Sequence, residues 1–426
     1  AQIDDPARIP EYINRAWHTA ISGRPGPVVL ALPEDMLCEL SDVSDIPPSI
    51  PVDNHPSSTD LEQLGDMLSN AQSPLVLVGD SGWNSEACAD LMTFVQNWNL
   101  PVAATFRSQD RFDNTHPNYA GDMGIGINPK LAERIKQSDL IIAIGTRLGE
   151  MVTDNYTLLK SPEPDQKLVH VYPGIEELGH VYRPTLGINA ALPAFLSAAA
   201  RLPATPGKWD NQTSVAHEDY LAWNTVPESV PGDVHMGEIV KWLNSNIAPD
   251  SFICNGAGNY SSWVHRFYQF KHYRSQLAPT NGSMGYGTPA AVAAKIVNPE
   301  RDVIAFAGDG CFMMNGQEFA TAVQYGANII VIVVNNSMYG TIRMHQEREY
   351  PARPSGTELV NPDFAALAQA YGGHGERVTK TEEFADAFMR AKASGKPAII
   401  EIIQDPESIT PSLSLSEITA IAQSKS

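Results

Sequence analysis

The sequence has few cysteines, and they are scattered. The four, Cys38, Cys88, Cys254 and Cys311, form no C-x-x-C pair, which argues against a zinc site or a disulfide framework and fits a reducing compartment such as the cytoplasm. Basic residues are also scarce, since 29 Lys and Arg stand against 49 Asp and Glu, a formal charge of −20. No basic run offers a footprint for a phosphate backbone, so nucleic acid is not an expected partner.

Long apolar runs are missing as well. The longest, residues 328–334 and 140–144 among them, fall far short of the roughly 20 residues that cross a bilayer, so no membrane partner is expected. The chain contains no HExxH, GxSxG or Walker-type sequence, which sets aside zinc hydrolases, serine hydrolases and nucleoside triphosphatases. With 426 residues, 43% of them hydrophobic, it has the material for two or three globular cores.

Helical and strand-like patterns alternate in two long stretches. Residues 59–200 and 233–405 each contain apolar runs of strand length separated by helical patterns. Such alternation predicts an α/β fold with two doubly wound parallel-sheet domains, a central Rossmann-like domain and a C-terminal one. Proline-rich or polar stretches at 41–58 and 201–232 are expected to be linkers, and residues 406–426 a C-terminal surface tail.

Residues 1–40 fit neither domain. A helical pattern over residues 10–21 is stopped by Gly23-Arg24-Pro25-Gly26-Pro27, and residues 28–32 then predict a short buried strand. One helix and one strand cannot bury both of their faces without more sheet. This piece is therefore interpreted as the remnant of a third domain, and Ala1 as a cut rather than a native start.

Two polar turns follow neighbouring apolar runs in the C-terminal domain. Gly308-Asp309-Gly310 ends one run and Asn335-Asn336 ends the next, with a helix capped by Asn315 expected between them. Because a strand, helix, strand unit is right-handed, both turns reach the same sheet edge. The Asp309 carboxylate, the Asn336 amide oxygen and the Met338 carbonyl are hard ligands that suit Mg²⁺ bridged to phosphate. Alone, Gly-Asp-Gly would also suit a plain turn between strand and helix.

The paired motif resembles the signature of thiamine diphosphate enzymes, and the whole chain resembles their acetolactate synthase-like branch. The resemblance implies that Asp309, Asn336 and the Met338 carbonyl hold Mg²⁺. It also implies a cofactor-binding set consisting of Gly256, Asn259, Gly282, Ser283, Met284, Gly308, Gly310, Cys311, Asn336, Tyr339 and Gly340.

In this resemblance the segment of residues 281–291 bends the cofactor. Met284 would be the wedge between its two rings, and the Gly282 carbonyl would accept a hydrogen bond from the pyrimidine amino group. By its residues alone, the segment also fits a glycine loop before a helix that Pro289 begins. The loop around Gly256 is likewise compatible with an ordinary turn after a strand.

Three further features concern substrate contact and nucleotide-containing cofactors. His345 could contact substrate or be an exposed helical histidine, and biosynthetic acetolactate synthases carry Trp at this position, which casts doubt on a classical branched-chain role. Residues 145–149 follow an apolar run where some family members hold FAD and others do not, so FAD is left open and not predicted. Residues 121–126 lack the strand-to-helix setting of a dinucleotide fingerprint.

The resemblance also implies what this chain would need for catalysis. Family enzymes have a pyrimidine-binding domain that supplies an activating Glu from a second subunit, so a homodimer or homotetramer is expected. No Glu in this sequence can be given that role, which leaves the catalytic residues unassigned. The chain alone is expected to be inactive or very weak, and sustained CO₂ release from pyruvate would contradict this.

The implied reaction of the full-length parent is decarboxylation of a small 2-oxo acid, pyruvate-like, followed by carboligation to a second carbonyl compound. Decarboxylation without ligation is one alternative, and analysis of the product, acetolactate or acetaldehyde, separates the two. A second alternative is a binding or assembly module without catalysis. Calorimetry with cofactor and Mg²⁺ tests retained binding.

Overall fold

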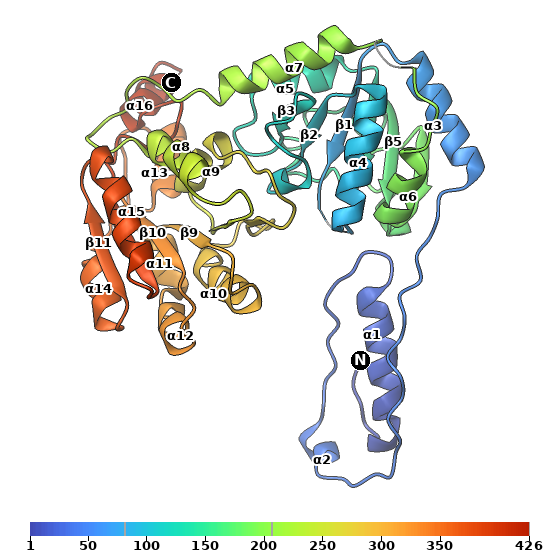
Figure 1. The fold of residues 1–426 in the computed structure, drawn as a ribbon, viewed down its shortest axis with the longest axis horizontal. Coiled ribbons are helices and arrows are strands. Elements are labelled where there is room, and N and C mark those ends of the chain that lie inside the picture. The colour runs from blue at the N-terminus through green and yellow to red at the C-terminus, as the bar shows by residue number, and fades with distance from the viewer. Residues whose placement is uncertain (81, 206–207, 426) are drawn as a thin grey trace. The chain divides into compact units, whose positions relative to one another are not determined.

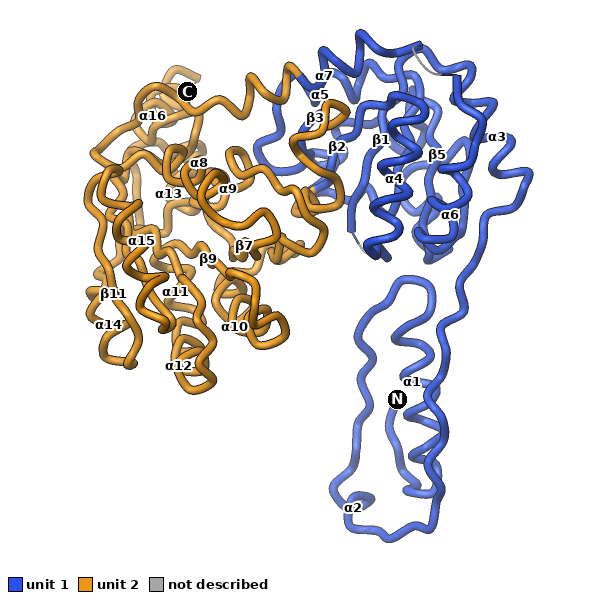
Figure 2. Tube along the Cα trace, viewed as in Figure 1, with its two compact units in different colours: residues 1–105, 120–217 blue, residues 106–119, 218–426 orange. Residues whose placement is uncertain are grey.

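The structure is a computed structural model that describes residues 1–80, 82–205 and 208–425. It divides into two compact units (Figure 2), unit 1 with Ala1–Thr105 and Ala120–His217, and unit 2 with Phe106–Tyr119 and Glu218–Ser426. The described residues form two six-stranded sheets, which lie in separate parts of the chain (Figure 1), and the prediction of two parallel-sheet α/β domains is confirmed. No helix in the described part of the chain is long and apolar enough to cross a membrane.

The first sheet has the strand order β3-β2-β1-β4-β5-β6. Strand β1 lies between β2 and β4 and pairs with both in parallel, and every residue of β1 and β4 is buried, as expected for strands covered on both faces. The strands are β1 (Pro74–Val78), β2 (Val102–Ala104), β3 (Tyr119–Asp122), β4 (Leu140–Ile144), β5 (Lys167–Tyr172) and β6 (Leu186–Asn189). The longer helices are α3 (Ser58–Asn70), α4 (Ser85–Trp98), α5 (Pro129–Gln137), α6 (Leu192–Ala199) and α7 (Asp210–Trp223).

The N-terminal residues contribute little to the core of unit 1. Helix α1 (Ile9–Ile21) has no buried residue, and α2 (Glu34–Leu37) buries only Met36. The prediction of a buried strand at residues 28–32 is wrong, because Val29 is 78% exposed and a single bridge joins Gln2 to Ala31. A strand needs a neighbour for its backbone groups, and the described chain provides little more than that bridge here.

The stretch expected to be the second linker contains α7. This helix begins next to Trp209, whose ring is buried and stacks on that of Trp98 with centroids 6.2 Å apart. The polar composition of residues 201–232 concealed the helix because only one face of it packs against the core. Residues 210–223 of this stretch are therefore helical, and those up to His217 belong to unit 1.

The second sheet has the order β11-β12-β10-β9-β7-β8, and its described pairs are parallel. Alternate residues of β9 belong to two different hydrophobic clusters. Ile304 and Phe306 are part of one cluster, and Val303 and Ala305 are part of the other, so both faces of the sheet are covered. The strands are β7 (Phe252–Asn255), β8 (Gln276–Leu277), β9 (Val303–Gly308), β10 (Ile330–Asn335), β11 (His374–Val378) and β12 (Ala398–Ile403). The helices are α8 (Met236–Asn246), α9 (Tyr260–Phe267), α10 (Gly287–Val297), α11 (Asp309–Asn315), α12 (Glu318–Gln324), α13 (Gly340–Glu349), α14 (Phe364–Ala370), α15 (Phe384–Ala393) and α16 (Leu415–Gln423).

Two details of unit 2 differ from expectation. Helix α11 begins at Asp309 directly after β9, so Asn315 is its last residue and not an N-cap. The C-terminal stretch contains α16, whose Leu415 and Ile418 are buried with Ile409 against α13. Its apolar positions are few but fall on one face, which is enough to hold the helix against its neighbour.

Candidate cofactor-binding site

A pocket lies at the carboxyl ends of β9 and β10. Val334 pairs with Gly308 in the sheet, so the two halves of the predicted motif leave adjacent strands at the same level. The lining residues are Ala257, Gly258, Asn259, Tyr260, Met284, Gly308, Asp309, Gly310, Cys311, Val334, Asn336, Met338, Tyr339, Gly340, Thr341, Ile342, Gln404 and Ile409. The structure therefore brings together most of the predicted set, whereas Gly256, Gly282, Ser283 and His345 are not among the lining residues.

Asp309 is the only acidic residue of this lining and is 2% exposed. One carboxylate oxygen accepts the Gly310 N–H at 2.8 Å, and the other accepts the Asn361 side-chain N–H, also at 2.8 Å. Burial raises the pKa of Asp309 despite these hydrogen bonds, because a buried carboxylate loses hydration that a few donors do not replace. A bound cation would supply the missing stabilisation of the charge.

The second half of the motif is a turn held by its own side chains. Asn335 accepts the Ser337 N–H at 3.1 Å and donates to Glu401 at 2.8 Å, so it supports the turn rather than facing the pocket. Asn336 lines the pocket and accepts the Met338 N–H at 3.3 Å. Ser337, between them, has a φ of 56°, in the left-handed region that non-glycine residues enter at some cost.

Met338 forms an isolated bridge with Glu358. The two hydrogen bonds of this bridge are made by the neighbours of Met338: Tyr339 N–H donates to the Thr357 carbonyl, and Leu359 N–H donates to the Ser337 carbonyl. The Met338 carbonyl itself stays outside the bridge. Together with Asp309 and Asn336 it forms a donor set of oxygens that suits Mg²⁺.

Asn361 joins the two halves of the motif and was not among the predicted site residues. Its side-chain N–H group donates to Asp309 at 2.8 Å and to the Asn335 side-chain oxygen at 2.9 Å. The residue lies 26 positions beyond Asn335, in a loop before α14, and no local pattern marks it. Only the folded arrangement reveals it as a group that orients the candidate metal ligands.

Replacing Asn361 with alanine is expected to weaken Mg²⁺-dependent diphosphate binding by roughly 10- to 100-fold, the range usual for groups that orient metal ligands. The substitution removes both hydrogen bonds of Asn361 and leaves the Asp309 carboxylate held by backbone N–H groups such as that of Gly310. Titration calorimetry with Mg²⁺ and inorganic pyrophosphate measures the effect. Asn246→Ala, at an exposed position on α8, is the matched control, and equal affinity in the two variants would contradict the role.

Two glycines of the predicted set pack too closely against neighbouring side chains to carry one of their own. A Cβ on Gly310 would stand 2.6 Å from the Tyr339 ring, and one on Gly256 would stand 2.5 Å from the Cys311 sulfur. Contacts this short force neighbouring atoms to move. Of the two, Gly310 lines the pocket, where backbone without a side chain can come close to a ligand.

The segment of residues 281–286 forms another part of the site. Met284 lines the pocket and packs against the core of unit 2. Asn281 organises the turn by accepting the Ser283 N–H at 3.2 Å and its hydroxyl at 2.9 Å. The Gly285 N–H donates to the Cys311 sulfur at 3.2 Å, which ties this segment to α11.

Gln404 and Ile409 also line the pocket and were not predicted. Gln404 donates its backbone N–H to the Asn335 carbonyl at 2.9 Å and its side-chain N–H to the Ser408 carbonyl at 3.0 Å. Both follow β12 in the stretch treated as the end of the domain and its tail. His345, in contrast, is an exposed residue of α13.

The fold and site together point to a class of enzyme that holds a diphosphate-bearing cofactor at the carboxyl edge of a parallel sheet. Residues 256–402 match the thiamine pyrophosphate enzyme C-terminal TPP binding domain, and residues 61–199 match the central domain of the same family. The chain belongs to the thiamine pyrophosphate (thiamine diphosphate) enzymes.

Relatives extend the similarity over most of the chain. The acetolactate synthase large subunit of Corynebacterium glutamicum is 31% identical over 94% of this chain, and the one from Lactococcus lactis is 28% identical over 94%. This chain spans 66% of the first relative and 70% of the second. The crystal structure of benzoylformate decarboxylase from Polynucleobacter necessarius has the same fold, with a TM-score of 0.77 at 20% identity, covering 97% of this chain and 76% of that one.

A flavin site in the central domain would lie at the topological switch point of its sheet. Strand order reverses between β1 and β4, where doubly wound sheets bind dinucleotides. The buried Trp83 indole lies there and donates to the Gly79 carbonyl at 2.9 Å. A Cβ on Gly145, in the loop after β4, would stand 2.5 Å from Leu192 and 3.0 Å from the Trp83 nitrogen. The Trp83 side chain therefore lies close to the loops that follow both strands.

Proposed function

We propose that this chain binds thiamine diphosphate and Mg²⁺, and that in the whole protein this site serves decarboxylation of a small 2-oxo acid followed by carboligation. The observation that carries the proposal is the convergence of Asp309, Asn336 and Met338 on the pocket that Met284 also lines. The similarity to acetolactate synthase large subunits supports the choice of reaction. A homodimer or homotetramer is part of the same proposal.

The residues of this chain would divide the work of binding. Asp309, Asn336 and the Met338 carbonyl would hold Mg²⁺, and the glycines at 308 and 310 would let the backbone approach the diphosphate. When bound, the cofactor would supply the electron sink that 2-oxo acid decarboxylation needs. Among the described residues the pocket lining contains no glutamate, so Met284 and its neighbours would orient the cofactor rather than activate it.

Titration calorimetry of the purified chain tests the proposal. Thiamine diphosphate is expected to bind only when Mg²⁺ is present, because a metal must join the Asp309 carboxylate to the phosphate oxygens. Magnesium pyrophosphate should bind more weakly, since it lacks the rings. No binding of either ligand would refute the proposed site. Analysis of the product from pyruvate with the whole protein separates carboligation from simple decarboxylation.

We also expect no flavin in this protein. Because the Trp83 side chain lies close to the loops that border the crevice between β1 and β4, purified protein should lack the visible absorbance of flavin, and added FAD should not be retained on gel filtration. Val215→Ala changes an exposed residue of α7 and is the control variant that is purified and compared with Trp83→Ala. Stoichiometric FAD in the unmodified protein would contradict the interpretation of the crevice.

A further inference from the structure

A segment from the middle of the unit 1 sequence packs in unit 2. Residues Phe106–Tyr119, which we name the clasp segment, follow β2 but belong to unit 2. The Gln109 N–H donates to the Gln276 side chain, which donates back to that of Gln109, both at 2.9 Å. Asn114 and Phe270 form a second reciprocal pair, at 2.8 and 2.9 Å. The clasp segment is therefore bound to unit 2 by specific polar contacts.

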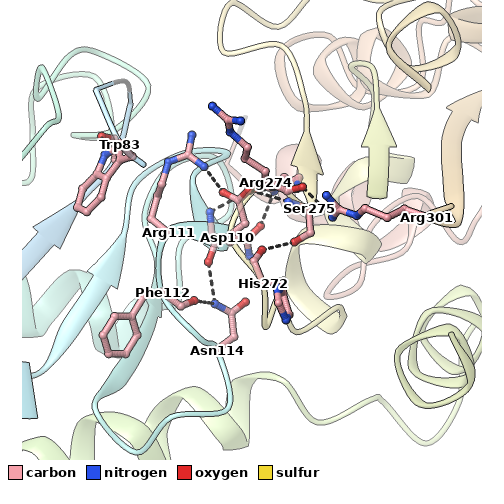
Figure 3. Close-up of polar contacts among 12 residues, drawn as sticks. Trp83, Asp110, Arg111, Phe112, Asn114, His272, Arg274, Ser275 and Arg301 are labelled. Atoms are coloured by element: carbon pink, nitrogen blue, oxygen red, sulfur yellow. Dashed lines mark hydrogen bonds and ion pairs between the residues drawn. The ribbon is translucent and has the colours of Figure 1, made fainter. Parts of the chain in front are cut away.

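A buried carboxylate lies at the centre of the clasp segment (Figure 3). Asp110 accepts the backbone N–H groups of Ser275 and Gln276, at 3.1 and 3.2 Å, and forms an ion pair with Arg111. These contacts lie at β8, the edge strand of the second sheet. Covering an edge strand satisfies backbone groups that would otherwise be open to pairing.

Arg107 reaches from the clasp segment to the loops around the candidate cofactor site. Its guanidinium donates to the Gly256 carbonyl at 3.0 Å and to the Pro279 carbonyl. Arg107 is 8% exposed and has a φ of 59°. Burial lowers the pKa of Arg107 to about 10, because its partners are carbonyls and not carboxylates. A buried cation in a strained backbone conformation is costly, and such features concentrate at functional sites.

The two loops that Arg107 joins are not equally supported by other contacts. The Gly256 carbonyl also accepts a hydrogen bond from Asn255 at 2.7 Å, and the Gly256 N–H donates to the Tyr260 hydroxyl at 3.0 Å. The Pro279 carbonyl has, besides Arg107, a turn hydrogen bond from Gly282 N–H at 3.3 Å. Gly285 stays tied to Cys311 and Asn315, so loss of Arg107 would release residues 279–283, which lead into Met284, more than the loop at Gly256.

We propose that Arg107 is a positioning residue that holds residues 279–283, and through them Met284, in place relative to the loop at Gly256. The inference rests on the proposed function, because the wall that Arg107 positions is the one that would face the rings of the cofactor in the same site. Arg107 itself lies outside the sequence of the C-terminal domain. This role predicts a specific asymmetry. Arg107 matters for a ligand that has rings and much less for one that has only the diphosphate and metal.

The experiment compares Arg107→Met and Arg107→Lys with Arg348→Lys, which makes the same Arg-to-Lys change at an exposed position of α13 outside the pocket lining. Titration calorimetry measures binding of thiamine diphosphate and of inorganic pyrophosphate, each with Mg²⁺. We expect both Arg107 variants to bind thiamine diphosphate about tenfold or more weakly, as loss of a charged hydrogen bond implies. Pyrophosphate affinity should change less than about threefold, and Arg348→Lys should match the unmodified chain in both titrations.

Hydrogen exchange without ligand gives an independent readout. Amides of residues 280–284 should exchange faster in Arg107→Lys, while those of α8 and α10 keep their protection. Unchanged exchange there, unchanged thiamine diphosphate affinity, or equal losses for both ligands would overturn the proposal. If the unmodified chain binds neither ligand, the proposed function fails, and the exchange result still decides whether Arg107 holds the segment. If Arg107→Met does not fold, Arg107→Lys carries both tests.

Discussion

Asp309→Asn is expected to reduce Mg²⁺-dependent binding of thiamine diphosphate by roughly a hundredfold or more, equivalent to about 3 kcal/mol. The substitution keeps the volume of the side chain but removes the only carboxylate in the pocket lining. The protein would then offer the divalent cation only the uncharged oxygens of Asn336 and the Met338 carbonyl, with no negative ligand of its own. Calorimetric titration of the variant with cofactor, at fixed Mg²⁺, measures the loss.

The pH dependence of binding gives this prediction a second test. Because burial raises the pKa of Asp309 in the cofactor-free protein, the carboxyl takes up a proton at higher pH than an ordinary aspartate. Mg²⁺ must displace that proton, so affinity should fall as pH drops through the raised pKa and should be retained above it. Asp386→Asn, exposed on α15, is the control and should follow the unmodified protein. Equal affinity of the two variants would contradict the metal assignment.

Strongly apolar runs made the sheets predictable. The apolar runs of strand length expected within residues 59–200 correspond to strands such as β1, β2 and β4, because buried parallel strands are apolar on both faces. In the second sheet, the two apolar runs that end in Gly308-Asp309-Gly310 and Asn335-Asn336 are β9 and β10, and the pairing of Val334 with Gly308 puts their carboxyl ends at one sheet edge, as expected. The placement of residues at these strand ends was therefore accessible from sequence.

Elements that depend on distant partners were not predictable in the same way. Strands β8 and β11 are short or polar and exist because a neighbouring strand completes their hydrogen bonds. Asn361 and Arg107 have no local pattern, since their roles come from loops that are far away in the sequence. The expected strand at residues 28–32 failed for the converse reason: its apolar composition was favourable, but the described chain gives it only one bridge.

Met284→Ala is expected to weaken thiamine diphosphate binding by about tenfold or more while leaving magnesium pyrophosphate binding nearly unchanged. Truncation removes the apolar side chain that would lie against the rings, and losing such a contact in a buried site costs about 2 kcal/mol or more. Met284→Leu, which has similar volume but is branched, should recover part of the affinity. Paired titrations with the two ligands measure both changes.

Met389→Ala is the matched control, because Met389 is 56% exposed on α15 and is not among the residues that line the pocket. It should bind both ligands as the unmodified chain does. An equal loss for both ligands in Met284→Ala would mean that Met284 supports the fold and not the rings. A loss confined to thiamine diphosphate in Met284→Ala and in the Arg107 variants, together with a loss of both ligands in Asp309→Asn, would divide the site into two parts: a metal and diphosphate side on Asp309, and a ring side on Met284 that the clasp segment holds in place.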